Sequence, residues 1–568
     1  MKTLTHQPHI IVGVQFKSRV GALGANCAFM RDEILSVRGR YGAQPVMLLF
    51  PEMAVSGYPL QDQVLTDAFI VDCWTHLIQD ILPVLDETTA ALIGLPLLSG
   101  GKRYNAVVLA SGGKILHVFT KVKLPNTSVF DEARTFSSGR ASVYAWKGIT
   151  YGVPICEDIW TTEVCVELRK QGAQILLSPN GSPSNVGKWR RRKAVIDAIL
   201  AATGLPLLYV NRWGGQDELV FDGRSVLMVP GEAPQMADMF TDAHIVFAFD
   251  GQAVGEVDID KPVRDRTLQQ ERYDHLQTGM DYVRYGRGRA VVSLSGGVDS
   301  TVVLAEAVDA LGADNVLAIS QPSGFSSDHS RNDARRFADA LGVRMETLEI
   351  EDSLQSIRAL LSVLGPVEGI TDENLQARLR GLNTMSASNM GKGWVLTTGN
   401  KSEMAVGYAT LYGDMNGAFN PIKDLYKTEV FDHGRFRAQR YRELGNTDAA
   451  DVLLKVVNKP ASAELRPDQF DSDSLPPYPV LDKVLFQIVE LRKVPREIFL
   501  KGIPRETIQR VYDLVDMSEF KRRQACPGIR WHGGDLDKDR RFPLDKAGWK
   551  PLDTEDGRVR ALMDELMA

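Results

Sequence analysis

The sequence predicts two α/β domains, the first a layered sandwich and the second a doubly wound parallel sheet. The 568 residues are enough for two large domains of this class. Hydrophobic residues make up 44% of the chain and charged residues 24%, which is typical of globular proteins. Short apolar runs alternate with helical stretches through both halves, as they do in α/β proteins.

Eight short apolar runs in the first half are predicted to be strands, because they end at Pro, Gly, Asn or charged residues. Several are unbroken rather than alternating, which favours strands that are covered on both faces. These runs are Ile10–Gln15, Val46–Phe50, Ala91–Leu95, Ala106–Leu109, Ile115–Phe119, Gly152–Ile155, Ile175–Ser178 and Leu207–Val210.

The charged stretch Asp258–Tyr273 contains Pro262 and has no convincing apolar face, so it marks the predicted domain boundary. The first domain is placed at residues 1–260 and the second at residues 261–568. A β-α-β-α-β pattern follows the boundary and predicts a parallel, doubly wound sheet. Its strands are Ala290–Leu294, Asn315–Ile319 and Arg344–Ile350, with helices that end near Leu311 and Leu341.

Charge and composition exclude several classes of protein. The 66 basic and 72 acidic residues give a net charge of −6, so no general attraction for nucleic acid or an anionic membrane is expected. The run Lys188–Lys193, apart from Lys188, is interpreted as a solvated helix face. No apolar run approaches the ~18 residues of a membrane helix, and no signal peptide is evident. Five cysteines without disulfide or metal spacing favour a reducing cytoplasm.

The segment Ser295–Ser300, with the sequence SGGVDS, stands between a predicted strand and a predicted helix. Its glycines let backbone N–H groups approach an anion, and the positive end of the helix favours phosphate. The segment lacks the lysine of a Walker loop. A carboxylate at Asp299, among the phosphate contacts, is suited to bind magnesium. The alternative is an ordinary glycine turn, but the order of strand, loop and helix favours a phosphate site.

This loop resembles the pyrophosphate loop of ATP pyrophosphatases, and further motifs in the second half resemble those of NAD synthetases. In that family the nicotinate carboxylate of deamido-NAD is adenylated, and ammonia then displaces AMP. The ordered set of motifs is more specific than any single member. The motifs are Asp372–Arg378, Thr398–Glu403, Tyr412–Asp414, Asp424–Thr428 and Ser462–Leu465.

The resemblance implies binding residues in the second domain. Contacts with ATP are expected at Ser293, Leu294, Ser295, Gly296, Gly297, Val298, Asp299, Ser300 and Thr398. Contacts with deamido-NAD are expected at Asn374, Glu403 and Lys521, and positions near the reacting phosphates at Lys427 and Ser462. Asp299 and Glu403 are expected to share the Mg²⁺ that accompanies ATP. Outside these motifs, Glu403 and Lys521 would be interpreted as solvated charges.

Three reactive side chains each follow a predicted strand in the first half, where α/β proteins usually place active sites. They are Glu52, Lys121 and Cys156. Alone, the cysteine would be interpreted as a buried hydrophobe and the other two as solvated charges. Together they suit covalent catalysis, with Cys156 as nucleophile, Glu52 as base and Lys121 as a stabiliser of the oxyanion.

The contexts of these residues resemble the nitrilase, or carbon–nitrogen hydrolase, superfamily. The matching segments are Phe50–Pro59, Lys121–Pro125 and Ile155–Trp160, and Asn180–Pro183 and Asn211–Leu219 fit its glutaminase branch. Nearly the whole chain therefore resembles the glutamine-dependent NAD synthetase family. The resemblance implies an α-β-β-α sandwich that hydrolyses glutamine through a cysteine thioester, joined to a Rossmann-like ATP pyrophosphatase domain.

The same resemblance implies further residues around the cysteine. Glu132 matches a supporting glutamate, and Ser182 and Lys188 match glutamine-binding positions. Thr127 falls in the glutamine site where some relatives carry tyrosine. Lys121 matches the catalytic lysine, with Lys123 as the alternative. The family forms homo-oligomers, as dimers or larger assemblies.

The resemblance implies a two-domain amidotransferase that forms NAD, AMP, diphosphate and glutamate from deamido-NAD, ATP and glutamine or ammonia. Three alternatives stay open. An amidotransferase for another acid is disfavoured by the deamido-NAD motifs. A stand-alone amidase is disfavoured by the intact phosphate loop and Glu403. A nucleotide sensor without activity would not need Glu52, Lys121 and Cys156 together.

Overall fold

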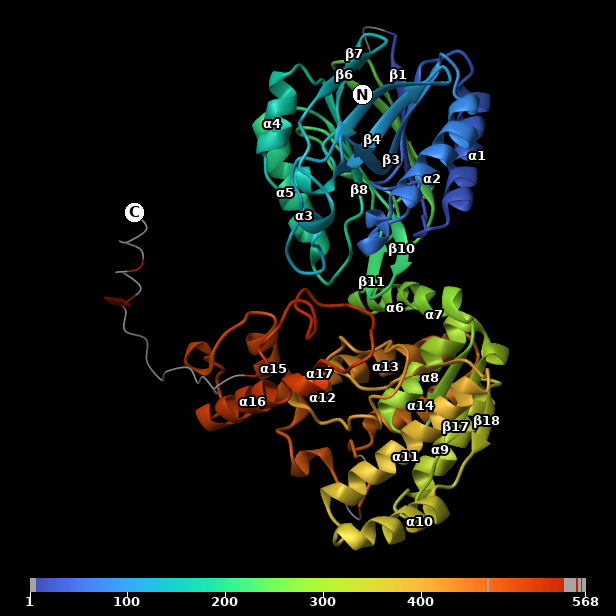
Figure 1. Ribbon diagram of the computed structural model, residues 1–568, viewed down its shortest axis with the longest axis vertical. Helices are drawn as coiled ribbons and strands as arrows, with labels where there is room; N and C mark the ends of the chain where they lie inside the picture. The colour runs from blue at the N-terminus through green and yellow to red at the C-terminus, as the bar shows by residue number, and fades with distance from the viewer. Residues whose placement is uncertain (1–6, 463, 467–468, 546–557, 560–562, 564–568) are drawn as a thin grey trace. The chain divides into compact units, whose positions relative to one another are not determined.

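The computed structural model describes residues 7–462, 464–466, 469–545, 558–559 and 563. The chain divides into two compact units, Met1–Asp281 and Tyr282–Ala568 (Figure 1). This division lies later in the chain than the position at 260/261 expected from charge. The reason is helix α6 (Leu268–Gly279), which packs on strands β10 (Trp213–Gln216) and β11 (Leu219–Asp222) and therefore belongs to the first unit.

The first unit contains two large sheets with helices outside them (Figure 1). The larger has the strand order β15-β14-β1-β2-β3-β4-β5 and the smaller the order β13-β12-β9-β8-β7-β6, while β10 and β11 form a separate hairpin. The strands are β1 His9–Gln15, β2 Val46–Leu49, β3 Thr89–Ser99, β4 Lys102–Ser111, β5 Lys114–Thr120, β6 Val143–Trp146, β7 Ile149–Gly152, β8 Ile175–Asn180, β9 Leu207–Asn211, β10 Trp213–Gln216, β11 Leu219–Asp222, β12 Val226–Met228, β13 Gln235–Met236, β14 Ala243–Phe249 and β15 Val254–Ile259.

The layers of this unit follow from which faces are apolar. Side chains from the inner faces of both sheets, such as Leu49 and Leu177, form one core. Helices α1 (Leu23–Tyr41) and α2 (Asp67–His76) cover the outer face of the larger sheet. Helices α4 (Glu163–Lys170) and α5 (Lys188–Thr203) cover the smaller sheet. The predicted α-β-β-α sandwich is confirmed, and the double coverage explains the unbroken apolar runs.

Seven of the eight runs predicted as strands in the first half correspond to strands, although their ends differ from those predicted. The eighth run, Gly152–Ile155, is wrong as a strand, because β7 ends at Gly152 and the next three residues lead into Cys156 without strand pairing. Strand β14 is not predicted from the sequence. Its sequence, AHIVFAF, contains the unbroken apolar run Ile245–Phe249, so the criterion applied to the other strands should have found it.

The second unit contains a parallel sheet with the strand order β18-β17-β16-β19. The predicted β-α-β-α-β order is confirmed, although the third strand is shorter than expected. The strands are β16 Ala290–Ser293, β17 Val316–Ser320, β18 Arg344–Thr347 and β19 Trp394–Leu396. The helices are α7 Asp281–Gly286, α8 Val298–Leu311, α9 Asp328–Ala340, α10 Glu351–Leu361, α11 Ile370–Asn389, α12 Lys401–Val406, α13 Lys427–Glu443, α14 Thr447–Asn458, α15 Tyr478–Val489, α16 Arg505–Met517 and α17 Glu519–Arg522.

The strand order places a topological switch point beside β16. Right-handed crossovers put α8 and α9 on one face of the sheet and α11 on the other. The loops that follow β16 and β19 therefore lead away in opposite directions and leave a crevice at the carboxyl ends of these strands. Open α/β sheets bind ligands at such a crevice.

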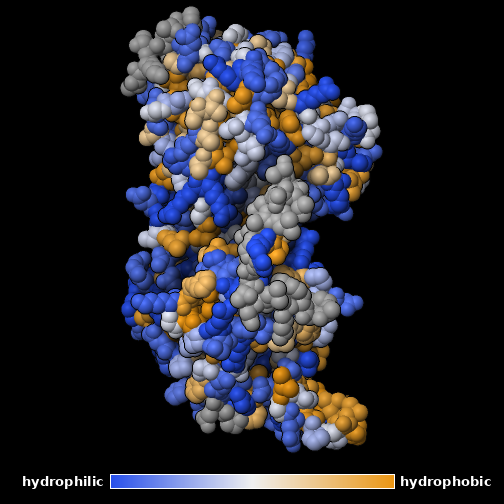
Figure 2. Space-filling view, turned by 90° about the vertical axis from the view of Figure 1, so that its left-hand side faces the viewer, coloured by the Kyte–Doolittle hydropathy of each residue, from blue (hydrophilic) through white to orange (hydrophobic). Residues whose placement is uncertain are grey.

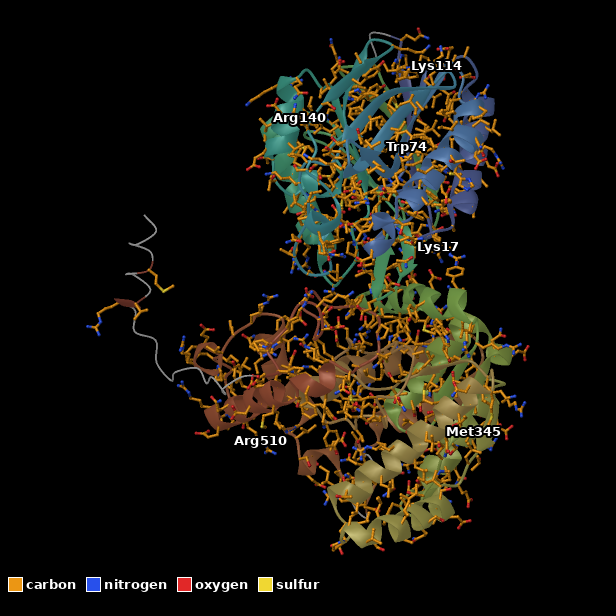
Figure 3. The ribbon with its side chains drawn as sticks, viewed as in Figure 1. Lys17, Trp74, Lys114, Arg140, Met345 and Arg510 are labelled. Carbon is orange, nitrogen blue, oxygen red and sulfur yellow. The ribbon has the colours of Figure 1, made fainter. Side chains whose placement is uncertain are left out.

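Apolar side chains remain exposed at one end of the second unit. Leu360, Val363 and Leu364, at the end of α10 and in the 3₁₀ turn after it, are 71%, 84% and 84% exposed. Figure 2 shows hydrophobic side chains gathered at the end of the unit where α10 lies in Figure 1. The edge strand β18, which carries Met345 (Figure 3), is also largely exposed.

Two further findings concern membrane-spanning helices and the cysteines. Within the described residues, no helix has both the length and the apolar character that crossing a membrane requires. The five cysteines are free thiols, and four of them are buried, including Cys156.

Candidate active sites

Glu52, Lys121 and Cys156 come together in the first unit. The side chains of Glu52 and Lys121 are fully buried, and Cys156 is 5% exposed. Lys121 Nζ lies 2.8 Å from Glu52 Oε1, while Glu52 Oε2 accepts the Gly181 N–H at 2.8 Å. Cys156 lies within electrostatic range of both charges.

The Cys156 backbone has a left-handed φ of 45° at the start of a short 3₁₀ turn, Cys156–Ile159. Such a conformation is strained in a residue other than glycine and is found at active sites. Burial raises the pKa of the Cys156 thiol well above its usual range; the Glu52 charge adds to this, and Lys121 opposes it. The thiol is therefore neutral at rest and needs a base to become a nucleophile.

Glu132, at the start of helix α3 (Glu132–Thr135), completes a buried cluster around Lys121. Its Oε2 lies 2.8 Å from Lys121 Nζ, and its Oε1 accepts the Tyr58 hydroxyl at 2.8 Å. Asn105 Nδ2 donates to Glu52 Oε1 at 2.7 Å. Burial alone would lower the pKa of Lys121, but Glu132 and Glu52 outweigh it and raise this pKa well above its usual range. The ammonium group therefore stays charged.

Tyr58 and Asn105 are members of this cluster that the sequence did not single out. Tyr58 lies inside the motif Phe50–Pro59, so the motif itself was a usable signal. Asn105 lies within β4 among apolar residues, and only its contact with Glu52 reveals its place.

The expected glutamine-binding residues differ in their burial and contacts. Ser182 is buried, and its backbone N–H donates to Asn211 Oδ1 at 2.9 Å. Lys188 begins α5 with its Nζ 4.4 Å from the centre of the Trp160 ring. Burial, followed by the charge of Arg192, lowers the pKa of Lys188 to about 8. Thr127 is exposed.

Arg192 corrects the interpretation of Lys188–Lys193 as a solvated face. Its side chain is 1% exposed and pairs with Asp222 at 2.8 Å. Its second terminal nitrogen donates to the Ser182 carbonyl at 2.7 Å. The sequence of the basic run does not reveal this ion pair, because the partner Asp222 lies in β11, outside the run.

In the second unit, the segment Ser295–Ser300 follows β16 and leads into the first turn of α8, which begins at Val298. Gly296 has a φ of +80°, and a Cβ atom there would lie 2.3 Å from the Ser330 carbonyl oxygen. Only glycine fits this turn. The Ser300 hydroxyl lies 3.1 Å from that of Ser295 and 3.3 Å from its backbone nitrogen, which holds the loop closed on itself.

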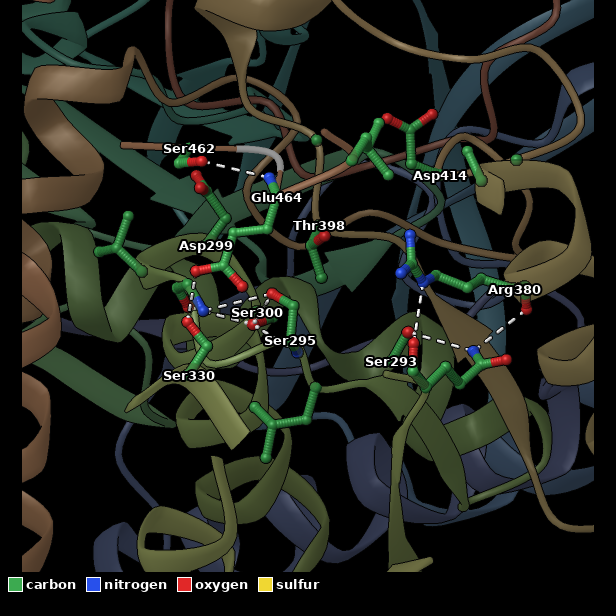
Figure 4. A pocket seen from close by; sticks show the side chains of 18 of the residues that line it. Ser293, Ser295, Asp299, Ser300, Ser330, Arg380, Thr398, Asp414, Ser462 and Glu464 are labelled. Carbon is green, nitrogen blue, oxygen red and sulfur yellow. Dashed lines mark hydrogen bonds between the residues drawn. The ribbon is translucent and has the colours of Figure 1, made fainter. Parts of the chain in front are cut away.

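The loop after β16 and the loop after β19 line one cavity of about 300 Å³ (Figure 4). It therefore lies at the switch point of the sheet. The structure brings together there the predicted residues Ser293, Leu294, Ser295, Gly297, Val298, Asp299, Ser300, Thr398, Glu403, Lys427 and Ser462.

Asn374 and Lys521 do not line this cavity but hold part of its wall. Asn374 Oδ1 accepts the Thr410 hydroxyl at 2.8 Å. Lys521 Nζ donates to the carbonyls of Gly407 and Ala409 at 2.7 and 2.8 Å. Thr410 itself lines the cavity, so both residues fix the segment that carries it.

Two carboxylates meet one ammonium group in the cavity. Lys427 Nζ lies 2.6 Å from Asp299 Oδ2 and 2.9 Å from Glu403 Oε1. Asn400 Nδ2 donates to Asp299 Oδ1 at 2.9 Å. Burial raises the pKa of Glu403 to about 7, with Lys427 opposing and Asp299 adding to the shift. Asn400 belongs to the motif Thr398–Glu403, but the sequence assigned it no role.

The donor set at this point fits magnesium. Asp299 and Glu403 offer oxygen atoms that converge on one cation, here the Lys427 ammonium. Mg²⁺ is usually held by one or two carboxylates together with phosphate oxygens and water. Across the described part of the chain, no group of three or more His, Cys, Asp or Glu residues is placed to hold a metal.

A second polar cluster lies beside Ser462 (Figure 4). Glu464 Oε1 accepts the Ser330 hydroxyl at 2.7 Å and Lys459 Nζ at 3.0 Å. The Glu464 N–H donates to the Ser462 hydroxyl at 3.2 Å. Sequence reasoning selected Ser462 from this motif, while Glu464 makes more of the contacts.

The two sites suit different chemistry. A buried thiol beside a carboxylate and an ammonium group suits acyl transfer from an amide. A glycine loop at a helix N-terminus, with carboxylates beside it, suits a magnesium nucleotide. The family model for carbon–nitrogen hydrolases matches residues 34–231, and the model for NAD synthases matches residues 272–525. The chain therefore joins a carbon–nitrogen hydrolase domain to an NAD synthase domain.

Full-length relatives share this combination. A glutamine-dependent NAD(+) synthetase of Rhodobacter capsulatus is 40% identical, over 93% of this chain and 97% of the relative. The corresponding Xanthomonas campestris protein is 38% identical, over 94% and 97%. This chain belongs to the family of glutamine-dependent NAD(+) synthetases.

Two solved structures are similar over most of their length. The glutamine-dependent NAD+ synthetase from Acinetobacter baumannii, in complex with ADP, aligns with a TM-score of 0.72 and 32% identity, covering 94% of this chain and 98% of that one. The enzyme from Cytophaga hutchinsonii aligns with a TM-score of 0.78 and 20% identity, covering 95% and 98%. The second likeness concerns the fold alone.

Proposed function

We propose that this chain converts deamido-NAD, ATP and glutamine or ammonia to NAD, AMP, diphosphate and, from glutamine, glutamate. One observation carries the proposal. A single chain holds a buried cluster of Cys156, Glu52 and Lys121 and, in its other unit, the Ser295–Ser300 loop with Asp299 in a cavity. The first is suited to release ammonia and the second to activate an acid with ATP.

The first reaction releases ammonia. Glu52 takes the proton of Cys156, and the thiolate attacks the carboxamide carbon of glutamine. Lys121 stabilises the oxyanion that forms. The C–N bond breaks, ammonia leaves with the proton returned by Glu52, and a thioester remains. Glu52 then activates water, which releases glutamate and restores the thiol.

The second reaction forms the amide. The Ser295–Ser300 loop binds the ATP phosphates, and the carboxylate of deamido-NAD attacks the α-phosphate, so diphosphate leaves. Ammonia then attacks the acyl carbon, and the C–O bond to AMP breaks. Lys427 offsets negative charge as these two polyanions meet. Asp299 and Glu403 would hold Mg²⁺, which supplies positive charge to the phosphates when bound.

The proposal extends to the surroundings of the chain. The protein acts in the cytoplasm, and its free thiols support this location. It needs no nucleic acid or membrane partner, which its net charge of −6 supports. It forms a homo-oligomer of two or more copies. The exposed apolar side chains of Leu360, Val363 and Leu364 support such an assembly, because they gain from burial.

A product assay tests the proposal. The purified chain is mixed with ATP, Mg²⁺, deamido-NAD and either glutamine or ammonium, and NAD, AMP and glutamate are measured. Equal amounts of NAD and AMP are expected with both nitrogen sources. Glutamate without NAD would indicate a stand-alone amidase, and turnover only with another acid would indicate a different amidotransferase. No turnover would leave a nucleotide-binding protein without activity.

A further inference from the structure

A buried carboxylate joins the two chain segments that carry Lys121 and Cys156. Asp158 is 1% exposed and lies in the short turn that Cys156 begins. Its Oδ1 accepts the N–H groups of Val122 at 2.9 Å and Lys123 at 2.7 Å. Its Oδ2 accepts the Ile155 N–H at 3.0 Å. One side chain therefore bonds the backbone directly after Lys121 and directly before Cys156.

The hydrogen bonds to the Asp158 carboxylate are strong, and one of them stabilises the strained backbone at Cys156. Hydrogen bonds to an ionised carboxylate are stronger than those between neutral groups, and burial removes competition from water. The left-handed backbone of Cys156 is strained and persists only if surrounding contacts fix it. The bond from Ile155 to Asp158 is such a contact, because it closes the turn around Cys156.

Lys121 and Cys156 reach the site from different sheets. Lys121 directly follows β5 of the larger sheet, and Cys156 follows β7 of the smaller sheet. The separation between the ammonium nitrogen and the sulfur therefore depends on contacts that cross between these layers. Asp158 makes two such contacts, with Val122 and Lys123, while its bond with Ile155 fixes the turn on the Cys156 side.

We propose that Asp158 is a positioning residue for the thiol chemistry, which sets the distance between the Lys121 ammonium group and the Cys156 sulfur through the backbone. The inference rests on the proposed glutaminase reaction. Asp158→Asn keeps the shape but turns an amide toward N–H donors, so at least one bond is lost and an N–H is left unpaired. Asp158→Glu keeps the charge and moves the carboxylate.

Asp250 provides a matched control in the same unit. It is also buried, and it also accepts two backbone N–H groups, from Gln252 at 3.0 Å and Ala253 at 2.8 Å. Its turn bonds Gln174, just before β8, so it lies at the amino end of the strands, away from Cys156. Asp250→Asn therefore tests the loss of a similar buried carboxylate at a distance from the site.

The experiment uses the full chain with Asp158→Asn, Asp158→Glu or Asp250→Asn. It measures kcat and KM for glutamine hydrolysis, ammonium-driven NAD synthesis, thermal unfolding, and the rate at which iodoacetamide alkylates Cys156. Asp158→Asn is expected to lower kcat by about 10- to 100-fold with KM changed less than about threefold, since small misplacements of reacting groups have such effects. Alkylation of Cys156 should change as well, while ammonium-driven synthesis stays normal. The kcat of Asp158→Glu should lie between those of Asp158→Asn and the wild type. The kcat of Asp250→Asn should be close to that of the wild type.

Normal kcat in folded Asp158→Asn would overturn the proposal, and so would an equal loss in Asp250→Asn. If Asp158→Asn fails to fold, Asp158→Glu decides, because wild-type kcat and alkylation in that variant would show that the carboxylate position is unimportant. If the wild-type chain hydrolyses no glutamine, the proposed function fails instead. The alkylation rate of Cys156 then still reports whether Asp158 fixes the thiol.

Discussion

Lys427 Nζ lies 2.6 Å from Asp299 Oδ2, although 128 positions separate the two residues in the chain. Asp299 stands in the first turn of α8 and Lys427 in the first turn of α13. The pair therefore joins the amino ends of two helices, whose dipoles favour anions. This relationship places a carboxylate, an ammonium group and two helix ends at one point of the cavity.

Asp299→Asn should lower NAD synthesis from glutamine and from ammonium alike, by about 100-fold or more. The reason is that the carboxylate acts on ATP, which both nitrogen sources require. The measurement is NAD formation with each source at saturating ATP. Asp352→Asn, an exposed residue in the first turn of α10, is the matched control and should have no effect. Normal ammonium-driven synthesis in Asp299→Asn would remove this residue from the mechanism.

Glu403→Gln should raise the Mg²⁺ concentration needed for half-maximal ammonium-driven synthesis by about tenfold or more. A neutral amide is a poorer ligand for Mg²⁺ than the carboxylate it replaces. Calorimetry of ATP binding at several Mg²⁺ concentrations gives a readout that is independent of turnover. Glu443→Gln, exposed at the end of α13, serves as control. An unchanged Mg²⁺ requirement would exclude Glu403 as a ligand.

Local sequence order accounts for much of both sites. Glu52, Lys121, Cys156 and the Ser295–Ser300 loop each follow a strand, and strand ends can be located from apolar runs. The switch point of the second sheet could not be located in this way, because it depends on β19, which the sequence analysis did not predict.

Contacts between distant segments could not be predicted in this way. Asn105 supports Glu52 from within a buried strand, and Arg192 turns away from its basic neighbours to meet Asp222. Neither contact has a periodicity or a local motif. The roles expected of Asn374 and Lys521 depended on resemblance, and the structure places both behind the cavity wall.

Isotope transfer should identify the bond that is cleaved. With deamido-NAD labelled by ¹⁸O in its carboxylate, one labelled oxygen is expected in AMP, because the carboxylate attacks the α-phosphate. Mass spectrometry of AMP and inorganic phosphate gives the answer. A label in inorganic phosphate together with ADP would refute adenylation even if NAD were formed.

Glutamine binding should weaken as the pH rises through about 8. Burial lowers the pKa of Lys188 to about 8, so its charge is present below this pH and is lost above it. Arg191 and Arg192 lower the pKa as well, while Cys156 and Asp222 oppose them. The positive charge attracts the carboxylate of glutamine, so the dissociation constant should rise above this pH.

Calorimetry with Cys156→Ala measures this binding without turnover, and Lys188→Arg in that background is the control. An arginine stays charged across this range, so the added change should remove the pH dependence beyond that of the glutamine amino group. Equal pH profiles for the two proteins would exclude Lys188 as the titrating group.

The most direct test of two separate chemistries in one chain is NAD synthesis by Cys156→Ala with each nitrogen source. Synthesis from glutamine should be abolished, while synthesis from ammonium should stay within about twofold of the wild type, because the thiol serves only to liberate ammonia. Cys165→Ala, which removes another buried free thiol of the same unit, should leave both activities intact. Efficient use of glutamine by Cys156→Ala, or loss of ammonium-driven synthesis in that variant, would contradict the account.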